Sequence, residues 1–410
     1  MLNEKEYMLV ETLPISGLTK DGRVGGTLVA QELTIHFPGK VVFGKGALSG
    51  LTGALHQMSA EKVFILTITP LLPRLLPLVE QLEQTGMSVW LDTSIKEEPS
   101  FEDFRIIMDR VTPLGPDVVV GIGGGSVLDI SKLVAAQLDN DQQLEDYVGI
   151  GLLKGRKKKL VCLPATSGTG SEVSPNAILV DNRDQQKKGI ISPFLVPDLV
   201  LVDPVLTLTV PPDVTAATGL DALIHCLEAY TNKFAHPLID VYAYEGMRQI
   251  AANLVQAVTE GDNEEARTGV SLGSLLGGFC LGPVNTAGVH ALSYPLGSTF
   301  HLAHGLSNAL LLPYVMEFNV PAAPQRYAQV ALALGCEPGD TDLETAYRGI
   351  ARVKELMQQC GVPCRLRDVG IPQDAIPELA TAAMKITRLL KNNPRPITQN
   401  DAVAIFKAAY

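Results

Sequence analysis

Apolar runs alternate with amphipathic stretches over the first half of the chain. The stretches 72–85 and 101–111 carry apolar residues at helical spacing, whereas the runs around them are short and continuous. The predicted strands are 62–67, 88–91, 117–120, 160–164, 177–180 and 199–202, with a further pair at 34–44 that a Pro-Gly turn interrupts. Strands that alternate with helices in this order predict a doubly wound, mostly parallel sheet.

The pattern changes between Pro204 and Pro212, and beyond this point the period is helical almost to the end of the chain. The sequence therefore predicts a dinucleotide-binding α/β domain over 34–205 and an all-α, metal-binding domain over 206–410. Residues 1–33 mix charges with glycines and show no clear period. We interpret them as an N-terminal extension, either a dimer arm or an added edge strand.

Composition narrows the class of protein. The 410 residues are 46% hydrophobic and 19% charged, which is typical of a globular protein with a large core. A net charge of −11 argues against nucleic acid or an anionic membrane as a partner. The six cysteines show no paired metal spacing, and charges at Glu4, Lys5 and Glu6 interrupt any signal peptide. We therefore expect reduced thiols in a cytoplasmic protein.

The uncharged segment 268–289 could be mistaken for a membrane span. Its glycines, which include Gly269, Gly273 and Gly277, dilute its hydrophobicity, and it runs directly into a cluster of histidines. A buried helix of the all-α domain is therefore the favoured interpretation.

Asp221 and His225 are the first candidates for chemistry. The run 220–230 contains no helix breaker, and Thr218 or Gly219 can cap its start. The carboxylate and the imidazole then lie one turn apart on one helix face, where they can hold a divalent metal. A salt bridge within the helix is the alternative explanation.

Three of the seven histidines lie together downstream, at His290, His301 and His304. With Asp221 and His225, two of them (His290 and His304) would complete a set of one oxygen and three nitrogen donors. Such a set suits a first-row divalent ion with positions open to substrate. His301 is a spare donor that could compete with its neighbour for the ion.

A predicted strand ends in a glycine-rich turn, Gly123, Gly124 and Gly125, which Ser126 follows. Glycines let a backbone approach a phosphate, and the start of the next helix offers unpaired N–H groups. Ser126 and Asp129 are predicted to act as a capping pair for that helix. The strict dinucleotide fingerprint is not met, because its third glycine would fall at Ser126, and a simple tight turn is the alternative.

A second loop follows the predicted strand 160–164 and gathers the hydroxyl groups of Thr166, Thr169 and Ser171. These hydroxyls can form hydrogen bonds to a nucleotide. An ordinary polar loop would have a similar composition, so this alternative stays open.

Four motifs together resemble the signatures of the iron-containing (group III) alcohol dehydrogenases. They lie at 123–126, 166–172, 218–225 and 304–308, and the segment 392–395 is similar too. The likeness runs from about Phe37 to Tyr410. It implies a dehydroquinate-synthase-like α/β domain followed by a helical domain, usually in a homodimer.

The resemblance also implies roles for individual residues. The implied metal ligands are Asp221, His225, His290 and His304, for Fe²⁺ or, as in some relatives, Zn²⁺. The implied contacts to NAD or NADP are Gly123, Gly124, Gly125, Ser126, Asp129, Thr166, Thr169, Ser171 and Thr67. Lys187, which lies with Lys188 in a predicted basic loop, matches a lysine near the active site of the family.

Two positions depart from the family pattern. Many members have a histidine linked to proton transfer where this chain has Tyr294, and tyrosine is a poor base at neutral pH. His301 could take that role instead. After Thr67, NAD-using members often carry an aspartate for the ribose hydroxyls, whereas this chain has Ile68, which permits NADP.

The expected function is reversible hydride transfer between a primary alcohol or its aldehyde and NAD(P), with the metal as a Lewis acid. Phe279, Tyr294, Phe300 and Leu302 suggest a partly apolar substrate pocket. One alternative is a dehydroquinate-synthase-like lyase, which would need several basic residues around a phosphate-bearing substrate. Another is a structural subunit with a degenerate site, suggested by the extension 1–33.

Overall fold

The computed structural model describes residues 32–96, 98–183 and 186–410, and Ile35–Tyr410 form one compact unit. The predicted extension 1–33 lies outside the described residues apart from its last two positions. Among the described residues, no helix is both long and apolar enough to cross a membrane.

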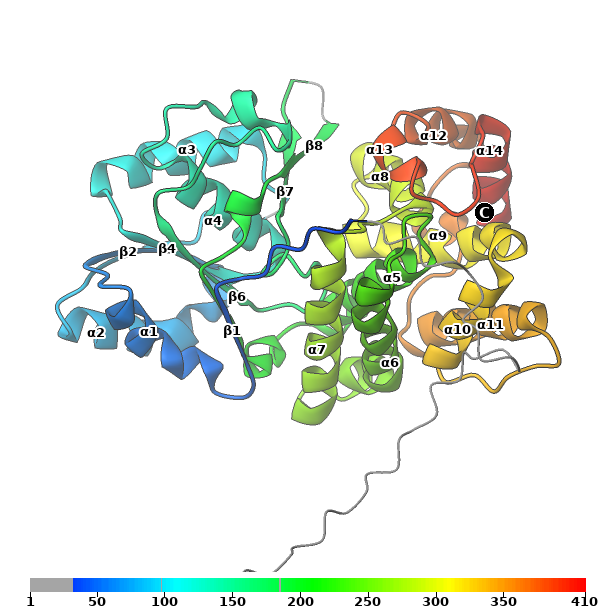
Figure 1. The fold of residues 1–410 in the computed structure, drawn as a ribbon, viewed down its shortest axis with the longest axis horizontal. Helices are drawn as coiled ribbons and strands as arrows, with labels where there is room; N and C mark the ends of the chain where they lie inside the picture. The colour runs from blue at the N-terminus through cyan, green and yellow to red at the C-terminus, as the bar shows by residue number, and fades with distance from the viewer. Residues whose placement is uncertain (1–31, 97, 184–185) are drawn as a thin grey trace, which may run out of the picture. The chain divides into compact units, whose positions relative to one another are not determined.

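A parallel sheet of six strands forms the centre of the first half, as predicted (Figure 1). Its order is β1-β9-β6-β4-β2-β3, and every pair in it is parallel. The strands are β1 (Lys40–Phe43), β2 (Lys62–Leu66), β3 (Ser88–Asp92), β4 (Val118–Gly123), β6 (Lys159–Pro164) and β9 (Leu199–Val202). The central strands are buried on both faces, which explains their continuous apolar runs.

Helices cover both faces of this sheet and create two hydrophobic cores (Figure 1). One face carries α1 (Leu51–Gln57) and α2 (Leu72–Gln84), and the other carries α3 (Phe101–Val111) and α4 (Gly125–Gln137). The helix α3 begins where the spacing predicts, because Ser100 and Asp103 form a complete capping box. This arrangement brings the carboxyl ends of β2, β4 and β6 side by side.

Two predictions about strands were wrong. Residues 34–38 form no strand, and β1 pairs with the distant β9 because Gly39 and Lys40 donate to the carbonyls of Pro197 and Asp198. Lys187 and Lys188 do not lie in a loop. They belong to β8 (Gln186–Ile191), which with β5 (Gly149–Ile150) and β7 (Asn176–Asp181) forms a separate three-stranded sheet.

The second half is helical, as predicted. Its helices are α5 (Pro212–Thr231), α6 (Pro237–Thr259), α7 (Glu264–Leu281), α8 (Gly288–Phe300), α9 (His304–Asn319), α10 (Pro324–Ala333), α11 (Asp342–Gln359), α12 (Ile376–Ala383), α13 (Thr387–Leu390) and α14 (Gln399–Ala408). The helix α5 is the central one, and every residue from Gly219 to Thr231 is buried.

The helix α5 begins at Pro212, so the predicted cap at Thr218 or Gly219 was wrong. Proline at the first helical position has a suitable φ and no N–H to leave unpaired, and this moves the start upstream. Thr218 lies inside the helix, where its hydroxyl donates to the carbonyl of Val214. The spacing of Asp221 and His225 on one face is unaffected.

The segment 268–289 forms most of α7, then a loop, then the start of α8. Its glycines allow close packing between helices. A Cβ on Gly273 would lie 2.4 Å from Cγ1 of Ile250 in α6, and one on Gly277 would lie 3.4 Å from Cβ of His225 in α5. The glycines that could suggest a membrane helix therefore bring α7 against the helices of the candidate metal site.

Candidate active site

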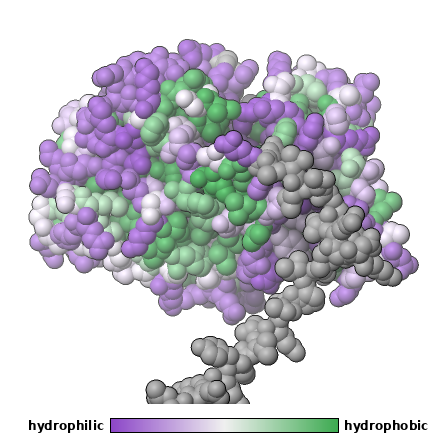
Figure 2. All heavy atoms as spheres, viewed as in Figure 1, coloured by the Kyte–Doolittle hydropathy of each residue, from purple (hydrophilic) through white to green (hydrophobic). Residues whose placement is uncertain are grey.

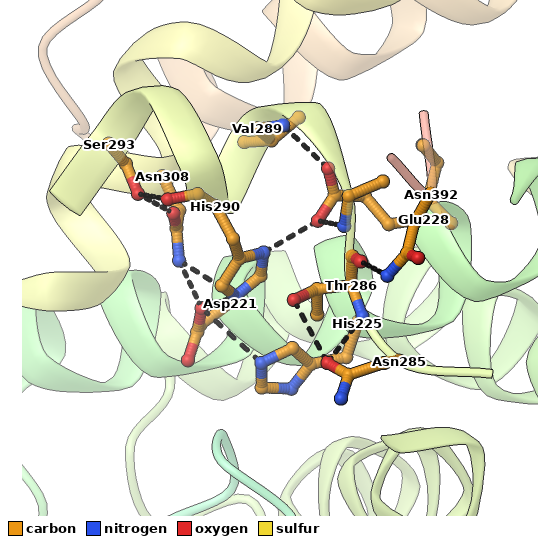
Figure 3. A network of polar contacts seen from close by, with 12 residues as sticks. Asp221, His225, Glu228, Asn285, Thr286, Val289, His290, Ser293, Asn308 and Asn392 are labelled. Carbon is orange, nitrogen blue, oxygen red and sulfur yellow. Dashed lines mark hydrogen bonds and ion pairs between the residues drawn. The ribbon is translucent and has the colours of Figure 1, made fainter. Parts of the chain in front are cut away.

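Three helices bring the four predicted metal ligands together. Asp221 and His225 come from α5, His290 from the first turn of α8, and His304 from the first residue of α9. The Oδ1 atom of Asp221 lies 3.5 Å from Nε2 of His290, 3.7 Å from Nε2 of His304 and 3.8 Å from Nε2 of His225. Figure 3 shows Asp221, His225 and His290 facing one another.

These distances fit a divalent cation. Metal–nitrogen and metal–oxygen bonds of about 2.0–2.2 Å in a tetrahedral site place neighbouring ligand atoms about 3.4 Å apart. The three separations from Asp221 exceed this value only slightly, and the donor atoms of Asp221, His290 and His304 all lie within 4.8 Å of one another. The residues present therefore fit the ion that the donor set implies.

The electrostatics of the cluster also favour a cation. Burial alone would raise the pKa of Asp221, but the neighbouring histidines hold that pKa well below its usual range. Burial lowers the pKa of His304 to about 3, so its ring is neutral and can bind a cation through a nitrogen lone pair. Burial also works to lower the pKa of His290, yet the carboxylates of Asp221 and Glu228 raise it to about 9. A cation at Nε2 of His290 would replace that proton.

Asn308 is a neighbour of the cluster that sequence reasoning did not single out. Its Nδ2 donates to Oδ1 of Asp221 at 2.7 Å and lies 3.1 Å from Nε2 of His290 and 3.2 Å from Nε2 of His304. Its Oδ1 accepts from the hydroxyl of Ser293. The side-chain amide thus faces the same atoms that would bind an ion. Its position four residues after His304, one helical turn away, was the signal that could have identified it.

The glycine-rich turn lies where β4 ends and α4 begins. Gly124 is the residue before the helix, and no side chain caps it, so the predicted capping pair of Ser126 and Asp129 was wrong. Asp129 instead accepts from Oγ of Ser171 at 2.5 Å and from the backbone N–H of Ile178 at 2.8 Å. Two of the predicted cofactor contacts, Asp129 and Ser171, therefore join α4 to the hydroxyl-rich loop, and their contact with a cofactor stays a prediction.

The two predicted nucleotide loops lie against each other. A Cβ on Gly125 would lie 2.6 Å from Cγ2 of Thr169, and one on Gly124 would lie 3.4 Å from Oγ1 of Thr166. Thr67, at the end of the adjacent strand β2, is fully buried, and its hydroxyl has no hydrogen-bond partner among the described residues. Unpaired helix N–H groups and an unsatisfied hydroxyl are features that a nucleotide can satisfy.

The hydroxyl-rich loop also packs on the helices of the metal cluster. A Cβ on Gly168 would lie 2.7 Å from Cβ of Thr218 in α5, and one on Gly170 would lie 2.3 Å from Cα of Gly278 in α7. Oγ of Ser167 lies 2.8 Å from Oγ of Ser271 in α7. The predicted cofactor loop is therefore in direct contact with the helix that carries Asp221 and with α7, which packs on it.

Of the three predicted catalytic residues, Tyr294 lies beside the metal cluster and Lys187 lies beside Tyr294. The ring of Tyr294 is 5.9 Å from that of His304, and Nζ of Lys187 is 5.6 Å from the Tyr294 ring and 2.5 Å from Oε1 of Glu98. Burial raises the pKa of Tyr294. His301 ends α8 in a left-handed conformation with φ 55°, and its side chain is exposed.

One residue predicted for the substrate pocket lies elsewhere. Phe279 packs on Phe37 and Tyr242, with ring centroids 5.3 and 5.5 Å away. Its ring therefore belongs to an aromatic group beside β1, because the side of α7 that carries it faces the sheet rather than α8.

The fold and the cluster define a metal-dependent oxidoreductase that acts on alcohols, and comparisons with known proteins agree. The sequence profile of iron-containing alcohol dehydrogenases matches residues 38–204, and that of the C-terminal part of the Fe-containing alcohol dehydrogenase family matches 215–410. The chain belongs to the iron-containing alcohol dehydrogenase family.

Relatives with known names include the long-chain-alcohol dehydrogenase 1 of Geobacillus thermodenitrificans, which is 37% identical over 92% of this chain and 96% of its own. The sulfoacetaldehyde reductase of Bilophila wadsworthia is 32% identical over 90% and 97%. Among solved structures, a 1,3-propanediol oxidoreductase superposes with a TM-score of 0.89 at 31% identity and covers 93% of this chain and 100% of its own. The predicted α/β plus all-α fold and the predicted enzyme class are thus confirmed.

Proposed function

We propose that this enzyme transfers hydride reversibly between a primary alcohol or its aldehyde and a nicotinamide cofactor, with one divalent ion held by Asp221, His225, His290 and His304. The observation that carries this proposal is the set of short separations between Asp221 and the three imidazoles. A lyase or a degenerate structural subunit has no comparable support, because the family favours a dehydrogenase and the donor atoms of Asp221, His290 and His304 lie close enough together to hold an ion.

The metal would be Fe²⁺, as the family name indicates, and the same oxygen and nitrogen donors also suit Zn²⁺. When bound, the ion would act as a Lewis acid toward the oxygen of the alcohol or aldehyde. The protein's part is to supply one carboxylate and three imidazoles, of which all but the half-buried His304 are buried, where charges interact more strongly than in water.

The cofactor would be bound by the two loops. Gly123, Gly124, Gly125 and Ser126 would face the pyrophosphate with backbone N–H groups, while Thr67, Thr166 and Thr169 would offer hydroxyls. A solved sulfoacetaldehyde reductase from Bifidobacterium kashiwanohense, with a TM-score of 0.83 at 26% identity, contains NAD⁺, which supports NAD here. Ile68, where an acid would repel a 2′-phosphate, leaves NADP as a second cofactor.

Proton transfer would involve the residues around the cluster. Tyr294 is a weak candidate for a base because burial raises its pKa. We assign the proton relay to His301, whose side chain is exposed to solvent at the end of α8. Lys187, whose Nζ lies 5.6 Å from the Tyr294 ring, would orient groups near that ring.

A homodimer is supported by an apolar patch on the surface (Figure 2) and by exposed apolar side chains just before β1 and in the first turns of α6. Phe37, Leu238 and Val241 are 49%, 52% and 67% exposed, and β1 lies at the edge of the sheet. Static light scattering would test the dimer by giving a mass near twice that of the chain. A cytoplasmic location is supported by the six cysteines, all of which are free thiols.

The test combines metal analysis with turnover. Replacing His290 with Ala should remove the bound ion and lower turnover of a panel of primary alcohols, measured by nicotinamide absorbance with NAD⁺ and NADP⁺, by at least ~10³-fold. His56→Ala, in α1 far along the chain, is the matched control and should keep both metal and activity. Full turnover by the His290 variant would remove the proposed ligand set.

A further inference from the structure

Glu228 is a buried carboxylate next to the metal cluster, without an assigned role. It lies on α5 seven residues after Asp221, so that both side chains project from the same face of the helix, two turns apart. Its side chain is 3% exposed. Burying a carboxylate so deeply costs free energy unless it accepts hydrogen bonds. The hydrogen-bond partners of Glu228 therefore indicate its role.

The partners of Glu228 are three N–H groups at the start of α8. Its Oε2 accepts from the backbone N–H of Ala287 at 3.0 Å and lies 2.6 Å from Nδ1 of His290. Its Oε1 accepts from the backbone N–H of Val289 at 2.6 Å. Figure 3 shows the His290 ring held between Glu228 on one edge and Asp221 on the other.

We propose that Glu228 is a positioning residue that fixes the tautomer and orientation of His290, so that Nε2 presents its lone pair to the metal. A carboxylate can only accept at Nδ1, so the proton of the neutral ring is kept there and Nε2 is left free. Nε2 is the atom that lies 3.5 Å from Oδ1 of Asp221. This inference rests on the proposed metal site and adds a residue to it.

The same carboxylate fixes the position of the ring as well as its protonation. The N–H groups of the first helical turn have no partners within the helix, and Glu228 accepts from those of Ala287 and Val289. Its negative charge also suits the positive end of the helix dipole. The helix α8 is therefore attached to α5 at the point where His290 projects, and the ring has little freedom to turn away.

Glu228→Gln is the sharpest test because it keeps the size of the side chain and removes only its charge and one acceptor. The amide would either present N–H toward Nδ1, which favours the tautomer with hydrogen on Nε2, or leave the backbone N–H groups without an acceptor. We expect affinity for Zn²⁺, measured by competition with a chromophoric chelator, to fall about 10- to 100-fold.

A second readout does not depend on activity. In Zn²⁺-loaded protein labelled with ¹⁵N-histidine, the proton on Nδ1 of His290 should appear far downfield in the natural sequence, and this signal should move upfield or vanish in Glu228→Gln. The seven histidines of the chain keep such a spectrum simple. Glu228→Asp, which keeps the charge on a shorter side chain, should give an intermediate affinity and is the second variant if the first does not fold.

The matched control loosens the same loop without touching the ring. Asn392→Ala removes the hydrogen bond from Nδ2 of Asn392 to the carbonyl of Thr286, just before α8, and should leave Zn²⁺ affinity within about threefold. Equal losses in the Asn392 and Glu228 variants would overturn the proposal, as would unchanged affinity and an unchanged Nδ1 signal in Glu228→Gln. If the natural sequence itself bound no Zn²⁺ or Fe²⁺, the proposed function would fail instead.

Discussion

The loops around the start of α4 and the cluster around His290 are both prepared for a ligand, but by opposite means. The loops use glycines, hydroxyls and backbone N–H groups, and a Cβ added to Gly125 would lie only 2.6 Å from Cγ2 of Thr169. The cluster uses buried charges, and each carboxylate in it has several partners. The loops therefore depend on the absence of side-chain atoms, whereas the cluster depends on matched charges.

Two buried glutamates illustrate the difference between the loops and the metal cluster. Glu228 accepts from three N–H groups. Glu172, at the end of the hydroxyl-rich loop, is 2% exposed, and burial raises its pKa to about 7. The charge of Lys132 and the backbone N–H of Glu172 lower that pKa without cancelling the effect of burial. The metal cluster thus contains a satisfied carboxylate, and the loop contains one that is easily protonated.

The largest expected effect comes from filling the space that the loop needs. Gly170→Ala should lower the free energy of unfolding by about 3 kcal/mol or more, because φ is +59° and the new Cβ would lie 2.3 Å from Cα of Gly278. The control is Gly335→Ala, where φ is +84° but nothing lies within 4 Å, and the cost should be about 1 kcal/mol. Urea unfolding measures the loss of stability in both variants. Equal losses would show that α7 can move to accommodate a Cβ at Gly170 at little energetic cost.

A smaller effect concerns Glu172 and pH. Its folded pKa of about 7 lies above the ordinary glutamate pKa of 4.5, so the folded state binds a proton more tightly than the unfolded state. The stability that this proton contributes is present below pH 4.5 and is lost as the pH rises from there to about 7. At 1.36 kcal/mol per pKa unit, the loss is roughly 3 kcal/mol.

Glu172→Gln should remove most of this pH dependence, which urea unfolding at pH 5 and pH 8 would measure. The exposed Glu80 of α2 offers a control. Glu80→Gln should leave unchanged the difference between the free energies of unfolding at pH 5 and at pH 8. A Glu172 variant with the same pH dependence as the natural sequence would contradict the idea that this carboxylate is destabilised by burial.

The smallest effect is expected at Tyr294. Because burial raises its pKa, the phenol stays protonated at neutral pH, and Tyr294→Phe should cost far less than the ~10²-fold loss that removal of a general base produces. The pH–rate profile should keep its shape in this variant and flatten in His301→Ala. Steady-state kinetics from pH 6 to 10 would compare the two, and a flattened profile in the Tyr294 variant alone would reverse their proposed roles.

Much of the fold could be predicted because its signals are local. The continuous apolar runs of β2 and β4 and the spacing of α3 depend on neighbouring residues alone. The start of α5 and the strand β8 could not be located in the same way. Pro212 and Thr218 both offer plausible starts, and the alternating polar residues around Lys187 look like a loop until β7 pairs with them.

By itself the sequence determined the donor types and the spacing of Asp221 and His225, because helix geometry places residues four apart on one face. It also determined which loops are rich in glycine and hydroxyl groups. Only the tertiary structure decided that α5, α8 and α9 meet at these donors. It also decided that Ser171 donates a hydrogen bond to Asp129, and that Glu228 and Asn308 contact the proposed ligands. These contacts join residues far apart in the chain, and burial and charge select them only once the helices have packed.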